Sequence, residues 1–551
     1  MNLSPEERAI GKTNFQAAIG SDLTRREFLA GSVAAAAVGG AGLGAFYFGY
    51  SKVTDPVRVG VIGTGDEGNV LINNITPDYL QVVAISDIRP YNVFRTFNGD
   101  HSSPSAAANR CGLMKKYGWK TETQARKKVK VYDDYKDLLA DKNIEAVIIA
   151  LPLHLHDVVA IEAMRADKHV LTEKLMAHSI AQCKDMGRVS KQTKKLLATG
   201  HQRHYSILYD NAVDTLKRGL IGEVHHIRAQ WHRGNLPGKD SWQQPMPKEI
   251  AAKLKDLEAK LDKDPGNTAY LKQKQIWEHQ VLDQAVDAAK YGYQEKTLSG
   301  GYVVSPLEEL IRWRLWQRTG GGLMAELGSH QLDASGIFCT AQRTDGKKAR
   351  PICVSAYGVR SLFPHDRECD DHVHCMYEYP MPDYDAKDPE LSQKKIVVSY
   401  SSINGNGFGG YGECVMGTKG TLILENEAEV MLFKDASTST SVGVVKGKSG
   451  PTLDTTASAG PSAAVASKAI DVGPVSRGYT EEMEHWAWCI RNFDYEHNQP
   501  KCQPKVAMAD AIIALTTNIA IRDNKRIEFK DEWFDIDNDE TPEGTKPSIK
   551  A

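Results

Sequence analysis

A strand, a glycine-rich turn, a helix and a second strand follow one another within residues 57–87. The turn reads Gly63-Thr64-Gly65-Asp66-Glu67-Gly68 and comes directly after the apolar run 57–62. In a GxGxxG turn the first glycine permits the tight bend, the second lets a pyrophosphate approach the backbone, and the third lets helix and strand pack closely. The N-terminus of the helix adds free N–H groups and the positive end of a dipole. The turn therefore predicts a dinucleotide site that includes Gly63, Thr64, Gly65 and Gly68.

An acidic residue ends this unit. The apolar run 80–85 leads to Ser86 and Asp87, and Asp87 lies nineteen positions after Gly68 (87 − 68). At about twenty residues past such a turn, an acid hydrogen-bonds a ribose 2′-hydroxyl. Arg89 is near enough to pair with a 2′-phosphate, but beside Asp87 we expect it to be solvated or to stack on adenine. The cofactor predicted at Asp87 and Arg89 is therefore NAD, with NADP as the alternative.

The length and charge of the chain limit what else it can be. A chain of 551 residues has room for two or three domains with sizeable cores. Its 68 basic and 70 acidic side chains nearly cancel, which does not favour a nucleic-acid partner. The nine cysteines form no CxxC pair. We expect them to be mostly buried thiols and expect no metal site.

The N-terminal segment 1–54 resembles an export signal. Arg25 and Arg26 precede an apolar run rich in alanine and glycine, as in twin-arginine signals. The alternative is an ordinary amphipathic helix start. No clear small-residue cleavage site follows, and the run 28–50 is about long enough to span a bilayer as an anchor. We expect the twin-arginine machinery as a partner, and a periplasmic protein or one held on the outer face of the inner membrane.

Two further strand ends in the region 55–205 carry polar residues. The apolar run 146–150 suits a parallel strand buried on both faces, and Pro152, His154 and His156 follow it. Because ligands bind at the carboxyl ends of such strands, Pro152 and His154 should border the nicotinamide, whereas His156 is better explained as a structural residue. The strand 169–172 ends in Glu173 and Lys174, where a lysine can contact a substrate hydroxyl or simply be solvated.

The second half, 206–530, holds a glycine-rich segment with an acid and a histidine. Three glycines, 320–322, precede Glu326 and His330, which share one face of a helix because they are four apart. A histidine titrates near neutrality and can take a hydroxyl proton, and the carboxylate can hold its ring or a substrate hydroxyl. A lone helical histidine is more often structural. Arg312 and Trp313 could bind substrate hydroxyls, although core packing is equally consistent with Trp313.

Three other segments have distinct composition. The charged segment 246–297 predicts an inserted helical hairpin, most consistent with a solvated arm or a subunit contact in a homo-oligomer, with an active-site lid as the alternative. Residues 436–476 are rich in Ser, Thr, Ala and Gly and predict a flexible loop. Helices are predicted over 479–492 and 506–522. The tail 531–551 is polar and should be loosely held.

Taken together, these motifs resemble the glucose–fructose oxidoreductase / inositol dehydrogenase / MocA-type (Gfo/Idh/MocA) family. The segments that carry the resemblance are the glycine-rich turn, Asp87, Pro152 with His154 and His156, Glu173-Lys174, Gly200-His201-Gln202-Arg203, and the Glu326–His330 segment. The resemblance implies an α/β protein, with a doubly wound parallel Rossmann sheet followed by an α+β domain that has a large, mostly antiparallel sheet.

The same resemblance implies roles for single residues. Lys174, His330 and Glu326 would be catalytic, with Lys174 and His330 as the proton-handling pair. Glu173 would lie at the cofactor, and Arg203 and His204 at the substrate. Leu175 stands where the family has proline, and Glu326 stands where it has aspartate, so its carboxylate is displaced by about one methylene.

The implied activity is hydride transfer between bound NAD(P) and a hydroxyl carbon of a sugar, polyol or derivative. Because little free NAD exists outside the cytoplasm, we expect the cofactor of an exported enzyme to be tightly bound and recycled. One alternative is a redox-neutral, NAD-dependent glycoside hydrolase that works by oxidation and elimination. Another is a non-catalytic sugar-binding protein.

Overall fold

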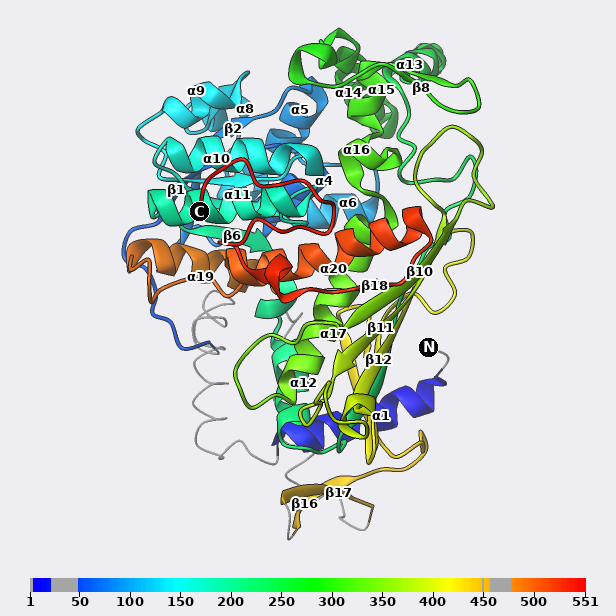
Figure 1. Ribbon diagram of the computed structural model, residues 1–551. Helices are drawn as coiled ribbons and strands as arrows, with labels where there is room; N and C mark the ends of the chain where they lie inside the picture. The colour runs from blue at the N-terminus through cyan, green and yellow to red at the C-terminus, as the bar shows by residue number, and fades with distance from the viewer. Residues whose placement is uncertain (1–2, 21–47, 448–449, 456–476) are drawn as a thin grey trace.

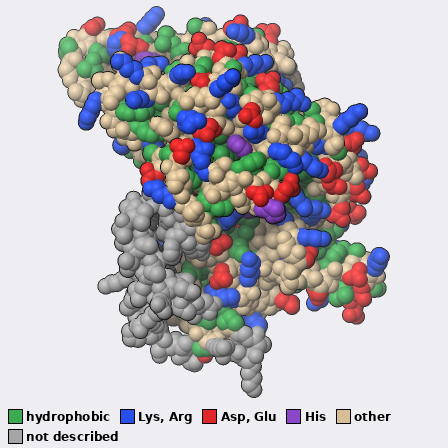
Figure 2. Space-filling model, turned by 90° about the vertical axis from the view of Figure 1, so that its left-hand side faces the viewer, with side chains coloured by type: hydrophobic (Ala, Val, Ile, Leu, Met, Phe, Trp, Pro, Cys, Tyr) green, Lys and Arg blue, Asp and Glu red, His purple; other side chains and the backbone are tan. Residues whose placement is uncertain are grey.

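The computed structural model describes residues 3–20, 48–447, 450–455 and 477–551 (Figure 1). The predicted twin-arginine motif and most of the segment 28–50 lie outside the described residues, as does most of the second half of the predicted loop 436–476. Basic and acidic side chains are interspersed over the face shown in Figure 2, in keeping with a net charge of −2.

The N-terminal domain is built on a six-stranded parallel sheet in the order β3-β2-β1-β4-β5-β6. This order and the helices on both faces are those of a doubly wound Rossmann fold, as predicted. The strands are β1 (Val57–Ile62), β2 (Leu80–Ser86), β3 (Lys130–Tyr132), β4 (Ala146–Ile149), β5 (His169–Glu173) and β6 (Leu197–Gly200). The helices are α4 (Asp66–Asn74), α5 (Pro90–Asn98), α6 (Pro104–Asn109), α7 (Leu113–Tyr117), α8 (Glu122–Arg126), α9 (Tyr135–Ala140), α10 (His156–Arg165) and α11 (Ile180–Thr193).

The C-terminal domain carries an eight-stranded sheet in the order β15-β14-β13-β7-β12-β11-β10-β18. Only the β7–β12 pair is parallel, so the sheet is mostly antiparallel, as predicted. Its strands are β7 (Val224–His232), β10 (Cys353–Val359), β11 (His372–Pro380), β12 (Lys395–Ile403), β13 (Tyr411–Gly417), β14 (Gly420–Glu425), β15 (Glu429–Lys434) and β18 (Ile527–Glu528). Its helices include α12 (Ile207–Lys217), α15 (Pro306–Ile311), α16 (Gln317–Gly320), α17 (Ser329–Ala341) and α20 (Pro504–Asp523).

The two domains share helices, because the chain returns to the first domain before it adds β18, the last strand of the second sheet. Helix α19 (Tyr479–Arg491) packs on the Rossmann sheet beside α4, and α20 packs against both α11 and α17 (Figure 1). Both match the predicted helices 479–492 and 506–522. Within the described residues α20 is long and apolar enough to span a membrane, but 72% of its apolar window is buried in the protein, as in a core helix.

Helix α1 (Pro5–Gly20) lies along β15, the edge strand of the second sheet (Figure 1). Asn14 donates from Nδ2 to the carbonyl oxygens of Leu432 and Thr440, both at 3.0 Å, and accepts from the amide of Val442 at 2.8 Å. Phe15 is only 4% exposed within the core of the domain. The helix therefore covers a sheet edge that would otherwise present unpaired backbone groups.

The charged insertion forms two antiparallel helices, α13 (Pro247–Leu261) and α14 (Thr268–Leu282), followed by a two-stranded ribbon, β8 (Lys296–Thr297) and β9 (Val303–Val304). It is not a free arm. Helix α14 packs on α5, where His279 stacks on Phe94 with ring centroids 3.8 Å apart, and Ile276 is buried beside Tyr91. These contacts hold α14 against α5, so the insertion forms part of the first domain.

Two other expectations need correction. The predicted flexible loop contains a β-hairpin, β16 (Gly443–Gly447) and β17 (Gly450–Asp454). The tail 531–551 is held firmly, because buried polar groups on α11 bind its backbone. Arg188 donates to the carbonyl oxygens of Ile536 at 2.8 Å and Ile549 at 2.6 Å, and Asp185 accepts from the amide of Ile549 at 2.7 Å.

Candidate active site

A cleft of 820 Å³ lies at the carboxyl ends of β1, β2, β4 and β5. Helix α17 and strands β7 and β13 of the second domain contribute to its walls, and so does the end of the helical insertion. Parallel strands place their carboxyl ends at one edge of the sheet, where ligands of this fold bind. The predicted site residues that line the cleft are Gly63, Gly65, Asp87, Arg89, Pro152, Glu173, Lys174, Trp313, Glu326 and His330.

The glycine-rich turn has the geometry that a dinucleotide requires. Gly63 has φ +84°, and a Cβ there would lie 2.4 Å from the carbonyl oxygen of Ala150. A Cβ on Gly68 would lie 2.2 Å from the carbonyl oxygen of Gly63, so this glycine sets the close approach of helix and strand. A Cβ on Gly65 would meet no atom closer than 3.9 Å. The backbone at Gly65 is therefore open to the cleft, and the residues present fit the pyrophosphate of a nicotinamide dinucleotide.

Asp87 both lines the cleft and supports this turn. Its carboxylate accepts hydrogen bonds from the amide of Thr64 at 2.7 Å and from Nδ2 of Asn92 at 3.0 Å. Arg89 is held by Asp283 of the insertion, whose Oδ2 lies 2.9 Å from Nε of the arginine. Asp283 is 1% exposed. Asp87 thus faces the cleft, whereas Arg89 already forms an ion pair with Asp283.

The residues after β4 divide into one that faces the cleft and two that support it. Pro152 lines the cleft. His154 packs edge-on against Tyr293, with ring centroids 5.4 Å apart, and burial lowers the pKa of His154 to about 3. His156 is buried and bridges the carbonyl oxygens of Leu151 and Leu175, each at 2.8 Å. The structural interpretation of His156 is therefore confirmed, and His154 contributes to the site only through its neighbours.

Lys174 reaches across the cleft from the end of β5 to the turn before α17. Its Nζ donates to the carbonyl oxygen of Glu326 at 2.6 Å and of Ala325 at 3.3 Å. That turn, Met324–Gly328, is π-helical, a geometry common at functional sites. It follows Gly321 and Gly322, which both have φ above +70°. The peptide bond between Lys174 and Leu175 is cis.

The two carboxyl groups beside Lys174 differ strongly in their proton affinity. Burial alone would raise the pKa of Glu326, but the charges of Arg314 and Lys174 outweigh it and lower the pKa to about 2. Arg314 donates from Nε to Oε2 of Glu326 at 3.0 Å. Burial, together with the charge of Glu67, raises the pKa of Glu173 to about 8. Of these two groups, Glu326 is ionised and Glu173 is largely protonated at neutral pH.

His330 stands one turn after Glu326 and shares the cleft with Lys174. Burial, and then the charge of Lys174, lower the pKa of His330 well below 6.5, so the ring is neutral at neutral pH. A neutral imidazole can accept a proton. Glu326 is paired with Arg314, so holding the imidazole is not its role in this arrangement.

Four residues predicted at the substrate have different surroundings. Arg203 is buried against Glu427 and Tyr209, and His204 donates from Nε2 to Oδ1 of Asp333 at 2.8 Å, so neither lines the cleft. Arg312 is buried and bonds Glu308 at 2.6 Å. Trp313 does line the cleft. Arg314, two positions after Arg312, is the arginine of this segment that lines the cleft.

Several cleft residues carried no recognisable signal in the sequence. They are Trp231, Arg233, Tyr411, Arg477 and Tyr479, from β7, the residue after it, β13 and the start of α19. Trp231 stacks on Tyr411 with centroids 4.3 Å apart and an interplanar angle of 11°. In the sequence, the one sign of these residues is that Trp231 and Arg233 stand two positions apart near the end of a strand. This pattern is too common to identify a site.

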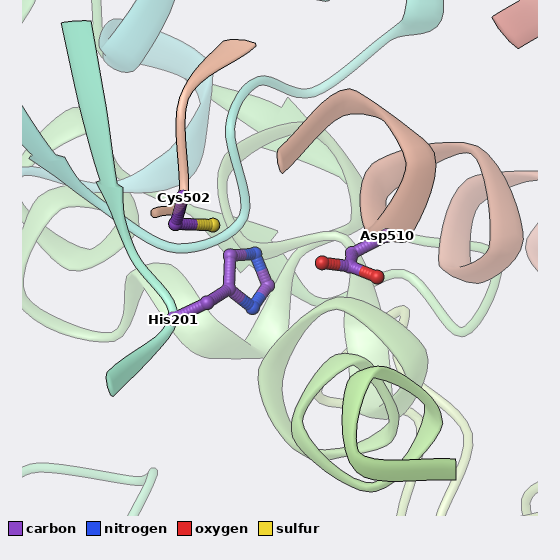
Figure 3. Close-up of side chains that lie close together, drawn as sticks. All are labelled: His201, Cys502 and Asp510. Atoms are coloured by element: carbon purple, nitrogen blue, oxygen red, sulfur yellow. The ribbon is translucent and has the colours of Figure 1, made fainter. Parts of the chain in front are cut away.

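A buried polar cluster lies behind the cleft. The side chains of His201, Cys502 and Asp510 point toward one another, from the end of β6, from the loop before α20 and from α20 itself (Figure 3). Burial lowers the pKa of His201 to about 3, so the ring is neutral. Lys348 pairs with both Asp510 and Asp333, and its ammonium group therefore supplies a positive charge to these buried carboxyl groups. All nine cysteines are unpaired, and Cys111 is the one that is not buried.

Comparison with known proteins identifies the first domain. Residues 57–201 match the GFO_IDH_MocA oxidoreductase family, NAD-binding Rossmann fold. The match extends from β1 to the residue after β6, so it covers the turn, Asp87 and Lys174.

The curated relatives match over the same region. A myo-inositol 2-dehydrogenase of Thermotoga maritima is 28% identical over 177 residues, which are 31% of this chain and 44% of that protein. An uncharacterized oxidoreductase, ORF334, of Rhizobium meliloti is 31% identical over 187 residues, which are 34% of this chain and 48% of that protein. The chain thus spans less than half the length of these relatives.

Solved structures show the same fold over more of the chain. The aldose-aldose oxidoreductase of Caulobacter crescentus, solved with glycerol, is 14% identical, with a TM-score of 0.50. The alignment covers 86% of this chain and 100% of that one. At this level of identity the likeness concerns the fold of both domains.

Proposed function

We propose that the protein is a nicotinamide-dependent oxidoreductase that transfers hydride between bound NAD and a hydroxyl carbon of a sugar, polyol or related molecule. The observation that carries the proposal is the position of Lys174 and His330. Both line one cleft with the glycine-rich turn, although they come from different domains. The fold supports NAD binding, and the inositol dehydrogenase among the relatives supports a polyhydroxylated substrate.

The chain's own residues would position the substrate and handle its proton. NAD, when bound, supplies the hydride acceptor. The neutral imidazole of His330 accepts the proton of the reacting hydroxyl. Lys174 donates a hydrogen bond to the same oxygen and stabilises the negative charge that develops there. Its bonds to the carbonyl oxygens of residues 325 and 326 hold it in place for this role.

A substrate panel with the full chain tests the proposal. The protein, saturated with NAD, is offered hexoses, inositols and glycosides, and absorbance of the reduced nicotinamide is followed together with product release. Net reduction with a free sugar or polyol is the expected result. Release of an aglycone without net reduction indicates the redox-neutral glycosidase instead. Binding without either reaction indicates a sugar-binding protein.

We propose NAD, tightly held, as the cofactor. Support comes from Asp87, which faces the cleft where a 2′-hydroxyl would bind, and from the ion pair that occupies Arg89. Mass spectrometry of the nucleotide that copurifies with the protein should find NAD at close to one per chain. Protein that is free of nucleotide after gentle purification would contradict tight binding.

We also propose export by the twin-arginine route, on the strength of Arg25 and Arg26 ahead of the apolar run. Helix α1 precedes this motif and packs on the second domain. Cell fractionation should find the protein outside the cytoplasm, and Arg25→Lys with Arg26→Lys should retain it inside. The intact mass of the exported form then reports whether the N-terminal segment is kept.

We also propose a homo-oligomer in which the second sheet forms the subunit interface. Tyr357 and Met376 lie on neighbouring strands β10 and β11 and are 61% and 58% exposed. Large exposed apolar side chains on one face mark an interface. Light scattering should therefore give a mass of at least two chains, and Met376→Lys should lower it.

A further inference from the structure

The wall of the cleft opposite the glycine-rich turn combines an aromatic platform with an arginine. Trp231 is near the end of β7, and Arg233 follows the strand two positions later, so both side chains project to the same side. The Trp231 ring stacks on Tyr411 and its centroid lies 5.5 Å from that of His330. The platform and the arginine are therefore next to the group that handles the proton.

Arg233 differs from the other arginines of the cleft in its partners. Arg314 is paired with Glu326, Arg477 with Glu427, Arg89 with Asp283 and Arg95 with Asp66. Among the described residues, no carboxylate lies within ion-pair distance of the Arg233 guanidinium. Its contact is with the face of Trp231, with the guanidinium carbon 5.6 Å from the ring centroid.

The ionised acids around the reacting centre are paired with other arginines and not with this guanidinium. Glu326 is paired with Arg314, and Asp66 with Arg95, although the charge of Glu326 also acts on Arg233. Glu173 is largely protonated at neutral pH, because burial raises its pKa to about 8. Burial lowers the pKa of Arg233, and the charge of Arg314 adds to this, while the charge of Glu326 opposes it without cancelling it. An unpaired cation in a partly desolvated cleft is unfavourable, and a bound anion would remove that cost.

We propose that the cleft binds a sugar that bears a carboxylate, such as a hexuronate or an aldonate, with Arg233 as the carboxylate contact. The inference rests on the proposed function and narrows its substrate class. The planar guanidinium fork matches a carboxylate in a bidentate geometry. The sugar ring packs beside the stacked pair of Trp231 and Tyr411, and its reacting hydroxyl meets Lys174 and His330.

Binding measurements on the full chain, saturated with NAD, test this without requiring turnover. Calorimetry or tryptophan fluorescence compares D-glucuronate, D-galacturonate and D-gluconate with D-glucose and D-galactose. We expect each acid to bind at least about 10-fold more tightly than its neutral counterpart. Arg233→Gln should weaken binding of the acids by about 10- to 100-fold and that of the neutral sugars far less, because the charge-assisted pair is made only with the acids.

Two further variants separate charge from structure. Arg228→Gln, on the same strand but exposed on its other face, should leave all the affinities unchanged. Arg233→Lys keeps the charge without the fork and should give an intermediate loss. Unchanged NAD affinity in each variant shows that the fold is intact. The affinities of glucose 6-phosphate and glucose 6-sulfate show which anion the cleft prefers. If either binds more tightly than the sugar acids, the assignment to a carboxylate is overturned.

The outcomes distinguish this inference from the proposed function. Acids that bind no better than neutral sugars, or an advantage that survives Arg233→Gln, overturn the inference. NAD-dependent oxidation of a neutral sugar by the same protein would then leave the proposed function standing. Conversely, acids that bind through Arg233 without any reduction of NAD support the inference and contradict the oxidoreductase.

Discussion

Replacing Asp87 with asparagine should change which nicotinamide dinucleotide the protein prefers. Asparagine has nearly the same shape, and its Oδ1 can still accept the hydrogen bond that the Thr64 amide now donates at 2.7 Å. The glycine-rich turn therefore keeps its support, and the variant removes one negative charge from the ribose end of the cleft, together with the acceptor of the Arg89 amide at 2.8 Å. Arg89 cannot compensate in the native protein, because Asp283 holds it at 2.9 Å.

The magnitude follows from the charges. Two unit charges about 4 Å apart repel by about 4 kcal/mol at an effective dielectric constant of about 20. Asp87 is half-buried, so solvent screening reduces its repulsion of a 2′-phosphate to about 2 kcal/mol, or about 30-fold in Kd. The ribose hydroxyl loses a charge-assisted bond worth about 1 kcal/mol more than a neutral one, or about 5-fold in the Kd of NAD. The ratio of the two dissociation constants should change by about 100-fold.

Fluorescence titration of the stripped protein with NADH and NADPH measures this ratio. Asp78→Asn, a surface substitution at an acid paired with Lys52, is the matched control and should leave both constants unchanged. Native protein that binds NADPH as tightly as NADH would refute the reasoning. So would an unchanged ratio in Asp87→Asn.

Three further predictions concern the proton-handling residues and the N-terminal helix. Lys174→Met should lower kcat/KM by about 10²- to 10⁴-fold with unchanged NAD affinity, and full activity in this variant would remove lysine from the mechanism. Because the pKa of His330 is held well below 6.5, activity should be lost only as the pH falls below that value, when the imidazole becomes charged. An acid limb of kcat/KM at or above pH 6.5 would contradict the assignment. Phe15→Ala should cost about 3 kcal/mol and lower the unfolding temperature, whereas Thr13→Ala on the exposed side of α1 should not, and equal effects would show that α1 is not docked.

Much of the first domain could be predicted from the sequence, because its signals are local. Gly63 and Gly68 are required by backbone geometry within the turn itself, and the apolar strands 57–62 and 146–149 can only be buried. The carboxyl ends of parallel strands then place Asp87 and Lys174 at one edge without further information. The pair Glu326 and His330 could be found because a helical turn fixes its spacing.

The second domain shows what local signals leave open. Arg312 and Arg314 look alike in the sequence, but packing turns the first toward Glu308 and the second into the cleft. Arg203 was predicted at the substrate and is buried against Glu427, more than two hundred residues later in the chain.

The sequence alone therefore determined the cofactor domain, since glycine geometry and strand burial depend on neighbouring residues. Only the tertiary structure decided which side chains form the wall that faces the cofactor. Trp231, Arg233 and Tyr411 meet there because β7 and β13 pair across nearly two hundred residues of chain. The direction in which a side chain points at such a site depends on the segment packed against it. The packing of the folded core determines which segment that is.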